Sequence, residues 1–166
     1  MLKIIDSLRD IDFRQLMDVY EEDNQRNGKQ NYSDFQDGLQ LIYAEQDFYT
    51  YLEIFFSEPT ARYAVWIEGE RYVSALRFER YRDGLLLNAL ETAPAARQKG
   101  YATRLICAVL DYLRSTGSGI LYTHIEKGNL PSLSVHKMCG FSVIADQAEY
   151  LDGTARTDSY TLSIQY

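Results

Sequence analysis

The sequence has few of the residues that build cross-linked or metal-bound proteins. Its 166 residues include two cysteines, two histidines and three prolines. Cys107 and Cys139 both lie in apolar segments of helical pattern, where a free thiol behaves as a small hydrophobic side chain. A zinc site needs four suitably spaced ligands, and no such set is present. We therefore expect a globular protein with no disulfide and no metal site.

Long apolar runs are also missing. A membrane span needs about eighteen consecutive apolar residues, and the first residues, Met1 to Asp6, lack the apolar stretch of a secretory signal. We expect a cytoplasmic protein that does not bind a membrane. The formal net charge of −7 repels a phosphate backbone and argues against nucleic acid as the main partner. The same charge is compatible with a cationic substrate.

The predicted elements alternate in the manner of one α/β domain spanning residues 1 to 166. Strands are predicted over 2–6, 63–67, 72–78, 85–90, 118–125, 141–151 and 159–166. Helices are predicted over 10–26, after a cap at Ser33 or Asp34, from Ala102 to about residue 113 and over 130–139. A polar loop is expected at 28–32, and turns are expected at 68–71, 82–84 and around 152–153.

The junction between the strand at 85–90 and the helix from Ala102 is the most informative feature. The first turn of a helix has four backbone N–H groups without internal partners and about half a positive charge, so it receives an anion readily. Gly100 and Ala102 let a phosphate approach the backbone, and Arg97 and Lys99 add positive charge. The nucleotide P-loop and the dinucleotide fingerprint are both absent. The residues predict a phosphate-bearing ligand without naming it.

Two motifs carry a resemblance to a known family. The loop resembles the signature of the GNAT superfamily of N-acetyltransferases, in which it grips the diphosphate of coenzyme A, and it reads Leu90-x-Thr92-x-Pro94-x-x-Arg97-x-x-Gly100-x-Ala102. The family's second motif, Asn-x-x-Ala/Ser-hydrophobic-x-hydrophobic-Tyr-x-x-hydrophobic-Gly-Phe, is similar to the segment from Asn129 to Phe141. There Asn129, Ser132 and His136 share one helix face.

The resemblance implies a fold and an acyl donor. The fold would be a mixed, mostly antiparallel central sheet of about six to seven strands with flanking helices, splayed at the fourth and fifth strands. Acetyl-coenzyme A would lie in the splay and acetylate an amine by direct attack in a ternary complex. The residues implied to bind it are Leu90, Thr92, Arg97, Gln98, Lys99, Gly100, Tyr101, Ala102, Thr103, Asn129 and Ser132.

The sequence departs from the commonest pattern of the family at one chemical position. His136 stands where a tyrosine usually protonates the leaving thiolate, as in members that resemble phosphinothricin acetyltransferases. An imidazolium, with a reference pKa of about 6.5, can donate that proton. His124 occupies a place where some members carry a proton-accepting glutamate. We predict His136 as the general acid and His124 as the base or water-orienting residue, with Glu91 and Glu126 as substitutes; purely structural roles for both histidines stay open.

The acceptor is not identified by the sequence. The resemblance implies that the first two helices and the last two strands surround it. Their aromatic residues form either an acceptor pocket or ordinary core, and they are Tyr32, Phe35, Tyr43, Phe48, Tyr49, Tyr51 and Tyr150. An acyl-coenzyme A sensor or binding module without turnover is the alternative function, and a small metabolite kinase or nucleotide enzyme is a third. The aromatic-rich terminal strands leave a homodimer open.

Overall fold

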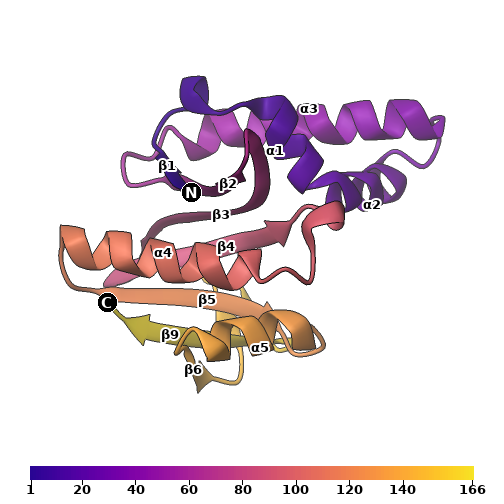
Figure 1. Cartoon of the computed structure of the whole chain (residues 1–166). Helices are drawn as coiled ribbons and strands as arrows, with labels where there is room; N and C mark the ends of the chain where they lie inside the picture. Colours follow the sequence, from indigo (N-terminus) through magenta and orange to yellow (C-terminus); the bar gives the residue numbers. More distant parts are fainter.

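A seven-stranded sheet forms the centre of the molecule in the computed structural model, which describes residues 1 to 166 (Figure 1). In spatial order its strands are β1 (Leu2–Ile5), β2 (Arg62–Glu68), β3 (Arg71–Tyr81), β4 (Gly84–Thr92), β5 (Ile120–Glu126), β9 (Ser159–Gln165) and β6 (Ser142–Ala145). Neighbouring strands are antiparallel except β4 and β5, which are parallel. This confirms the predicted mixed, mostly antiparallel sheet.

Helices cover both faces of the sheet (Figure 1). They are α1 (Phe13–Val19), α2 (Glu21–Asn31), α3 (Asp37–Phe55), α4 (Tyr101–Thr116) and α5 (Leu130–Met138), with short 3₁₀ turns η1 (Leu8–Asp10) and η2 (Pro94–Ala96). Successive residues of β2 point to opposite faces, so Ala64 joins the core under α4, whereas Tyr63 and Val65 join the core under α1 and α3. None of these helices has the length and apolar character that crossing a membrane requires.

The best-patterned helix forms as predicted. Its five apolar positions at helical spacing are all buried, and they are Leu105, Ile106, Val109, Leu110 and Leu113. They pack against Leu76 of β3, Leu87 of β4 and Leu121 of β5 in one cluster. Because this cluster reaches three central strands, it fixes where α4 begins relative to the end of β4.

The first helical region differs from the prediction in two ways. The expected helix over 10–26 is divided at Tyr20, which ends α1 and begins α2. The expected loop at 28–32 is wrong, since α2 continues to Asn31. Gly28 lies inside α2 because α3 passes very close: a Cβ there would lie 2.6 Å from the carbonyl oxygen of Gln40. The glycine permits a helix contact and does not break the helix.

The second helix begins later than predicted. Gln36, rather than Ser33 or Asp34, precedes α3. Three apolar side chains at its start are exposed, namely Phe35, Leu39 and Ile42, at 46%, 43% and 57%. The helical spacing of Leu39 and Ile42 predicted the helix, but their side chains do not contribute to the core.

The C-terminal segment is more divided than predicted. The expected strand over 141–151 is split into β6 and β7 (Ala148–Glu149). β7 pairs with β8 (Ala155–Arg156) in a separate ladder across the expected turn, where Gly153 has φ +85°. β6 pairs with β9 through a register shift between Val143 and Ala145, and the chain leaves the sheet there. β9 is therefore the strand inserted between β5 and β6.

The two cysteines are free and lie near each other. Cys107 is exposed on α4, and Cys139, which follows α5, is partly buried. Their sulfur atoms are 3.9 Å apart. Burial, reinforced by the neighbouring Cys107, raises the pKa of the Cys139 thiol to about 12. Cys139 therefore remains a neutral thiol that contacts both helices.

Candidate active site

The parallel strands β4 and β5 separate partway along their length (Figure 1). They are paired over Leu85–Leu87 and Leu121–Thr123. Beyond these pairs β4 continues to Thr92 and β5 to Glu126. The sheet is thus open between residues 88–92 of one strand and 124–126 of the other, at the carboxyl ends of both strands.

A backbone irregularity marks the point where the strands separate. Ala89 has φ +53°, a left-handed conformation that is unfavourable for a residue with a Cβ. The pairing of β3 with β4 also shifts register between Ala75 and Arg77, close to this residue. The Tyr20 hydroxyl donates a hydrogen bond of 2.6 Å to the Ala89 carbonyl oxygen. The α1–α2 junction therefore holds the strained peptide in place.

A cavity of about 220 Å³ lies between the separated strands and α5. All four predicted catalytic residues line it, together with Leu90, Asn129 and Ser132 of the predicted cofactor set. Its complete lining is Leu87, Asn88, Ala89, Leu90, Glu91, Thr123, His124, Ile125, Glu126, Asn129, Ser132 and His136. Residues from the two motifs are thus brought together at one site.

His136 is the most enclosed polar side chain in this cavity, with 1% of its surface exposed. Its Nδ1 lies 2.8 Å from the carbonyl oxygen of Ser132. Burial lowers the pKa of His136, and the contact with Ser132 opposes this only in part. A neutral ring that donates its Nδ1 proton to the carbonyl leaves a lone pair on Nε2, which is buried without a protein partner. At rest, His136 therefore offers a proton acceptor.

His124 leaves β5 among aromatic rings. Its ring packs edge-on against Tyr81 and Tyr150, with centroids 5.5 and 5.0 Å away. Tyr81 donates its hydroxyl proton to the Glu149 carbonyl oxygen, so the 3.4 Å contact between Tyr81 and His124 Nε2 suits a proton on Nε2. Burial, followed by the charge of Arg82, lowers the pKa of His124. Its Nδ1 is also buried without a partner.

The two carboxylates differ sharply in environment. Burial raises the pKa of Glu91 to about 7, Asp23 adds to the effect, and Arg97 opposes it. Glu126 is exposed and forms an ion pair of 3.2 Å with Arg156. A general base works best with a pKa near the operating pH, so Glu91 has the better environment for that role.

The loop before α4 presents free backbone donors. Gln98 and Gly100 have φ +62° and +77°, which turns the chain sharply into the helix. Arg97 N–H is bonded to the Pro94 carbonyl oxygen, but the N–H groups from 98 to 103 have no protein acceptor. Nothing lies within 4 Å of a Cβ built on Gly100, so a ligand can approach. These are the donors that a diphosphate requires.

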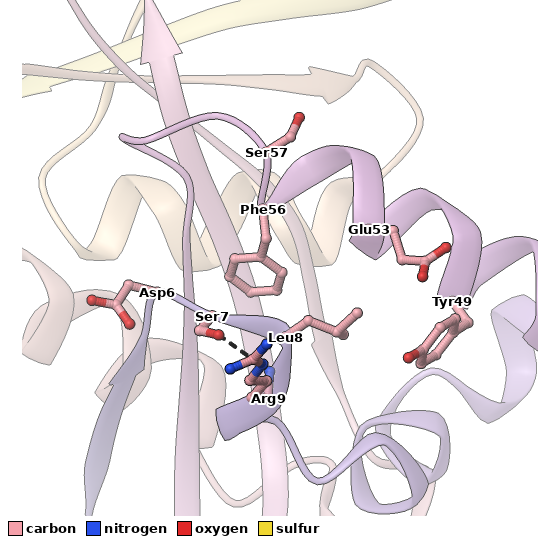
Figure 2. A pocket seen from close by; sticks show the side chains of 8 residues that line it. All are labelled: Asp6, Ser7, Leu8, Arg9, Tyr49, Glu53, Phe56 and Ser57. Atoms are coloured by element: carbon pink, nitrogen blue, oxygen red, sulfur yellow. Dashed lines mark hydrogen bonds between the residues drawn. The ribbon is translucent and has the colours of Figure 1, made fainter.

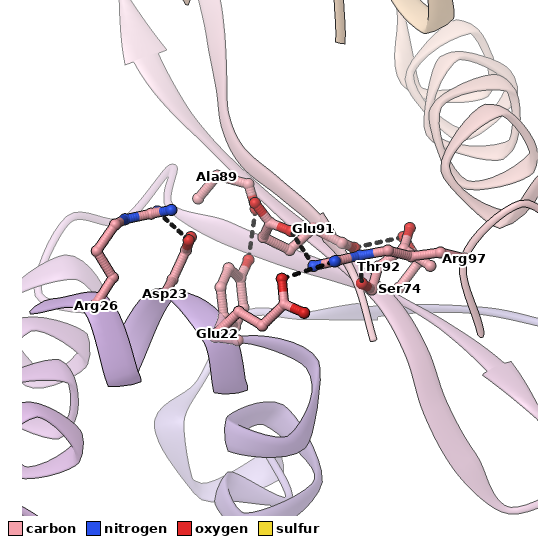
Figure 3. A network of polar contacts seen from close by, with 9 residues as sticks. Glu22, Asp23, Arg26, Ser74, Ala89, Glu91, Thr92 and Arg97 are labelled. Carbon is pink, nitrogen blue, oxygen red and sulfur yellow. Dashed lines mark hydrogen bonds and ion pairs between the residues drawn. The ribbon is translucent and has the colours of Figure 1, made fainter. Parts of the chain in front are cut away.

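The two basic residues of this loop are engaged with protein, and Figure 3 shows the contacts of Arg97. Arg97 lies 2.7 Å from Glu22 and 3.9 Å from Glu91, and it also donates to the Thr92 carbonyl oxygen at 3.2 Å. Lys99 donates to the Ala95 carbonyl oxygen at 3.1 Å. The backbone amides, rather than these side chains, are the unengaged anion-binding groups of the loop. Contact of Arg97 and Lys99 with coenzyme A stays a prediction.

Asn129 and Ser132 have local structural partners. The Asn129 side-chain oxygen accepts from the Ser132 N–H at 3.1 Å and so caps α5. The Ser132 hydroxyl lies 3.4 Å from His136 Nδ1. Together they fix the first turn of α5 and the His136 ring beside the cavity. Their contact with the cofactor, like that of Thr92, Tyr101, Ala102 and Thr103, stays a prediction.

Sequence reasoning missed the contribution of α1 and α2. Three residues of this region act on the site from the helical layer. Tyr20 bonds to the Ala89 carbonyl oxygen and Glu22 pairs with Arg97. Asp23 helps to raise the pKa of Glu91. No motif or spacing links them to β4, because these contacts depend on how the layers pack.

A second hollow, of about 460 Å³, lies away from both motifs (Figure 2). It is lined by Asp6, Ser7, Leu8 and Arg9 near η1 and by Tyr49, Glu53, Phe56 and Ser57 at the end of α3. The hydrogen bond drawn there, from Arg9 N–H to Ser7 Oγ, caps a 3₁₀ turn. Tyr49, one of the aromatic residues expected for an acceptor pocket or core, contributes to it, whereas none of the predicted catalytic or cofactor-binding residues does.

The sequence is similar to a known family and to known proteins. The sequence model of the acetyltransferase (GNAT) family matches residues 13–141. Streptothricin acetyltransferase from Streptomyces lavendulae is 25% identical over 89 residues, which cover 54% of this chain and 47% of that protein. The chain therefore matches about half the length of this relative.

Solved structures show the same fold. PaiA N-acetyltransferase from Thermoplasma acidophilum, solved with coenzyme A, has a TM-score of 0.66 at 12% identity, covering 100% of this chain and 99% of that one. An aminoglycoside 6'-acetyltransferase type Ii has a TM-score of 0.66 at 13% identity, covering 99% and 96%.

Proposed function

Because the chain belongs to the acetyltransferase (GNAT) family, we propose that it moves the acetyl group of acetyl-coenzyme A to a primary amine of a small molecule or peptide. One observation carries this proposal: the four predicted proton-handling residues line the opening between β4 and β5, and β4 leads directly into the loop whose amides from 98 to 103 are free. The relatives named for streptothricin and for an aminoglycoside support a small-molecule acceptor. Residues 1 to 166 would form a single domain that contains the whole reaction site.

The donor would bind across the opening. Its diphosphate would accept hydrogen bonds from the N–H groups of 98 to 103 at the mouth of α4, and its pantetheine arm would lie between β4 and β5. A backbone amide between Leu90 and Thr92 would polarise the thioester carbonyl, because oxyanion stabilisation requires a fixed donor at that oxygen. The strained peptide at Ala89 supports this placement, since strain of this kind gathers at functional sites.

Three proton transfers would be needed. The acceptor arrives as an ammonium ion, and Glu91, with its pKa near 7, would take the first proton, directly or through water held by His124. The amine then attacks the carbonyl carbon and the carbon–sulfur bond breaks. His136 Nε2 would accept the surplus proton from the attacking nitrogen and return it to the departing sulfur. His136 would thus act as the general acid expected from the sequence, using a proton that it takes up during the reaction.

An amine panel with acetyl-coenzyme A tests the function directly. Release of free thiol that depends on an acceptor supports the transferase. Binding of coenzyme A without thiol release for any acceptor would favour the acyl-coenzyme A sensor. A melting temperature raised by ATP and unaffected by coenzyme A would favour a nucleotide enzyme. Sedimentation would test the homodimer.

A further inference from the structure

Arg77 of β3 is a largely enclosed cation with no anionic partner. Its guanidinium carbon lies 4.5 Å from the centroid of the Tyr51 ring and 5.9 Å from that of Phe55. Its Nε is buried without a hydrogen-bond partner. Charged groups inside proteins are normally paired and hydrogen-bonded. The stacked rings hold the guanidinium flat, and the Tyr63 hydroxyl, opposite Arg77 on β2, is a neutral polar neighbour that does not balance its charge.

No carboxylate of the protein neutralises this guanidinium. Arg77 forms no ion pair within 4.0 Å, and of its three nitrogens Nε alone is both fully enclosed and unpartnered. The two terminal nitrogens therefore retain contact with solvent. Glu79, two positions along the same strand face, influences Arg77 only through space. The protein supplies no counter-ion for these two donors.

The position of Arg77 relates it to the proposed reaction. In the pairing of β3 with β4 it is opposite Asn88, which lines the cavity between the strands. Opposite residues of antiparallel strands are about 5 Å apart at Cα. The next residue along β4 is Ala89, and Glu91 is three positions beyond Asn88, a rise of roughly 10 Å. A small molecule can span the two groups.

We propose that Arg77 binds a carboxylate of the acceptor, so that the substrate class is an amino-carboxylate whose amine reaches Glu91 and the thioester. A guanidinium presents two parallel N–H donors in a plane, which match the two oxygens of a carboxylate. Tyr51 and Phe55 fix that plane in advance. The inference rests on the proposed function for the reaction that follows binding, and the binding itself can be measured separately.

Matched acceptors that differ only in the carboxylate test the proposal. Thiol release from acetyl-coenzyme A would be compared for 6-aminohexanoate against hexylamine and for lysine against cadaverine. We expect the wild type to use the carboxylated member of each pair at least tenfold better in kcat/KM. Arg77→Gln should lower kcat/KM for the carboxylated acceptor by about tenfold to a hundredfold, as for loss of a charged hydrogen-bonded contact. The same change should leave kcat/KM for the plain amine almost unchanged.

Arg80→Gln is the matched control, because Arg80 is an exposed arginine on the same strand. Arg80→Gln should leave kcat/KM unchanged for both acceptors of each pair. Arg77→Lys keeps the charge without the planar fork and should restore part of the preference. Equal use of both members by the wild type would overturn the proposal, as would an equal loss for both in Arg77→Gln. If Arg77→Gln does not fold, the wild-type preference and Arg77→Lys decide by the same criteria.

Calorimetry separates this proposal from the proposed function. If no acceptor releases thiol, acetyl transfer is wrong, but the wild type should still bind 6-aminohexanoate at least tenfold more tightly than hexylamine. Arg77→Gln should abolish that difference. Equal affinities in the wild type would overturn the carboxylate site whatever the enzyme activity.

Discussion

At the scale of single residues, burial gives Glu91 the pKa that its proposed role as a general base needs. Its pKa of about 7 means that the fraction able to accept a proton rises across neutral pH. We expect kcat/KM to increase with pH through about 7 and then to level off. Glu91→Gln should lower kcat/KM by about a hundredfold, as for loss of a general base, and remove this rise. Pre-steady-state and steady-state thiol release across pH 5 to 9 measure this pH dependence. If kcat/KM of Glu91→Gln still rises near pH 7, another group is responsible for the titration.

The same carboxyl makes a prediction about stability. Its pKa is raised from an ordinary 4.5 to about 7 in the folded protein. The folded state therefore holds more protons than the unfolded state between these values, and this group makes the protein less stable as pH rises through that window. The stability gained by Glu91→Gln over the wild type should be near zero at pH 4 and largest above pH 7. Urea unfolding at both pH values measures it, and a gain independent of pH would contradict the origin of the shift.

His136 gives a residue-scale test of the acid role. His136→Phe should lower turnover at least tenfold and leave acetyl-coenzyme A binding nearly unchanged, because the proposed diphosphate contacts lie on a different element. The sequence alone located this residue through its motif. It did not reveal the ring's charge, which depends on the burial that lowers the pKa of His136 and on the Ser132 carbonyl. An unchanged pH profile in the variant would remove His136 from the proton transfers.

At the scale of elements, the α2–α3 contact makes Gly28 a test of packing. Gly28→Ala would bring a Cβ to 2.6 Å from a backbone oxygen of α3, which has no flexible end to move aside. We expect a loss of about 1 to 3 kcal/mol in the free energy of unfolding, as for overpacking. Gly38→Ala is the matched control in α3, since nothing lies within 4 Å there, and it should be neutral or slightly stabilising. Equal effects of the two changes in urea unfolding would refute the contact.

Elements were predictable from sequence where local pattern and burial agree. The five apolar positions of α4 define one face, and β4 is apolar on both faces because it lies mid-sheet. Prediction failed where the deciding contact is distant in sequence. A glycine in a polar segment predicts a loop, and the reason for Gly28, its close approach to Gln40, lies in another helix. The division of 141–151 depends on pairing with β9. The motifs located the cavity lining, whereas Tyr20, Glu22 and Arg77 lay outside every motif.

At the scale of the whole molecule, the opening between β4 and β5 divides the sheet into two parts. The strands β1 to β4 lie on one side and β5, β9 and β6 on the other, and the ladder that joins them involves three residues of each strand. The core beneath α4 continues across this seam through Leu87, Leu121 and Leu162. The two parts are thus held together by apolar packing on one face and by few backbone hydrogen bonds.

A ligand that spans the seam should therefore stabilise both parts at once. At a concentration of about 100 times its Kd, coenzyme A should add about 2.7 kcal/mol to the free energy of unfolding. Slower amide exchange should extend along β5 and β9, which none of the amides proposed to bind the diphosphate touches directly. Gly100→Asp should abolish both effects, because it adds a β-carbon at φ +77° and a negative charge facing the diphosphate. Gly69→Asp, also at positive φ but in the turn between β2 and β3, is the control for backbone strain. Protection confined to α4 would mean that coenzyme A binds the loop without crossing the opening, and the proposed path of its pantetheine arm would then be wrong.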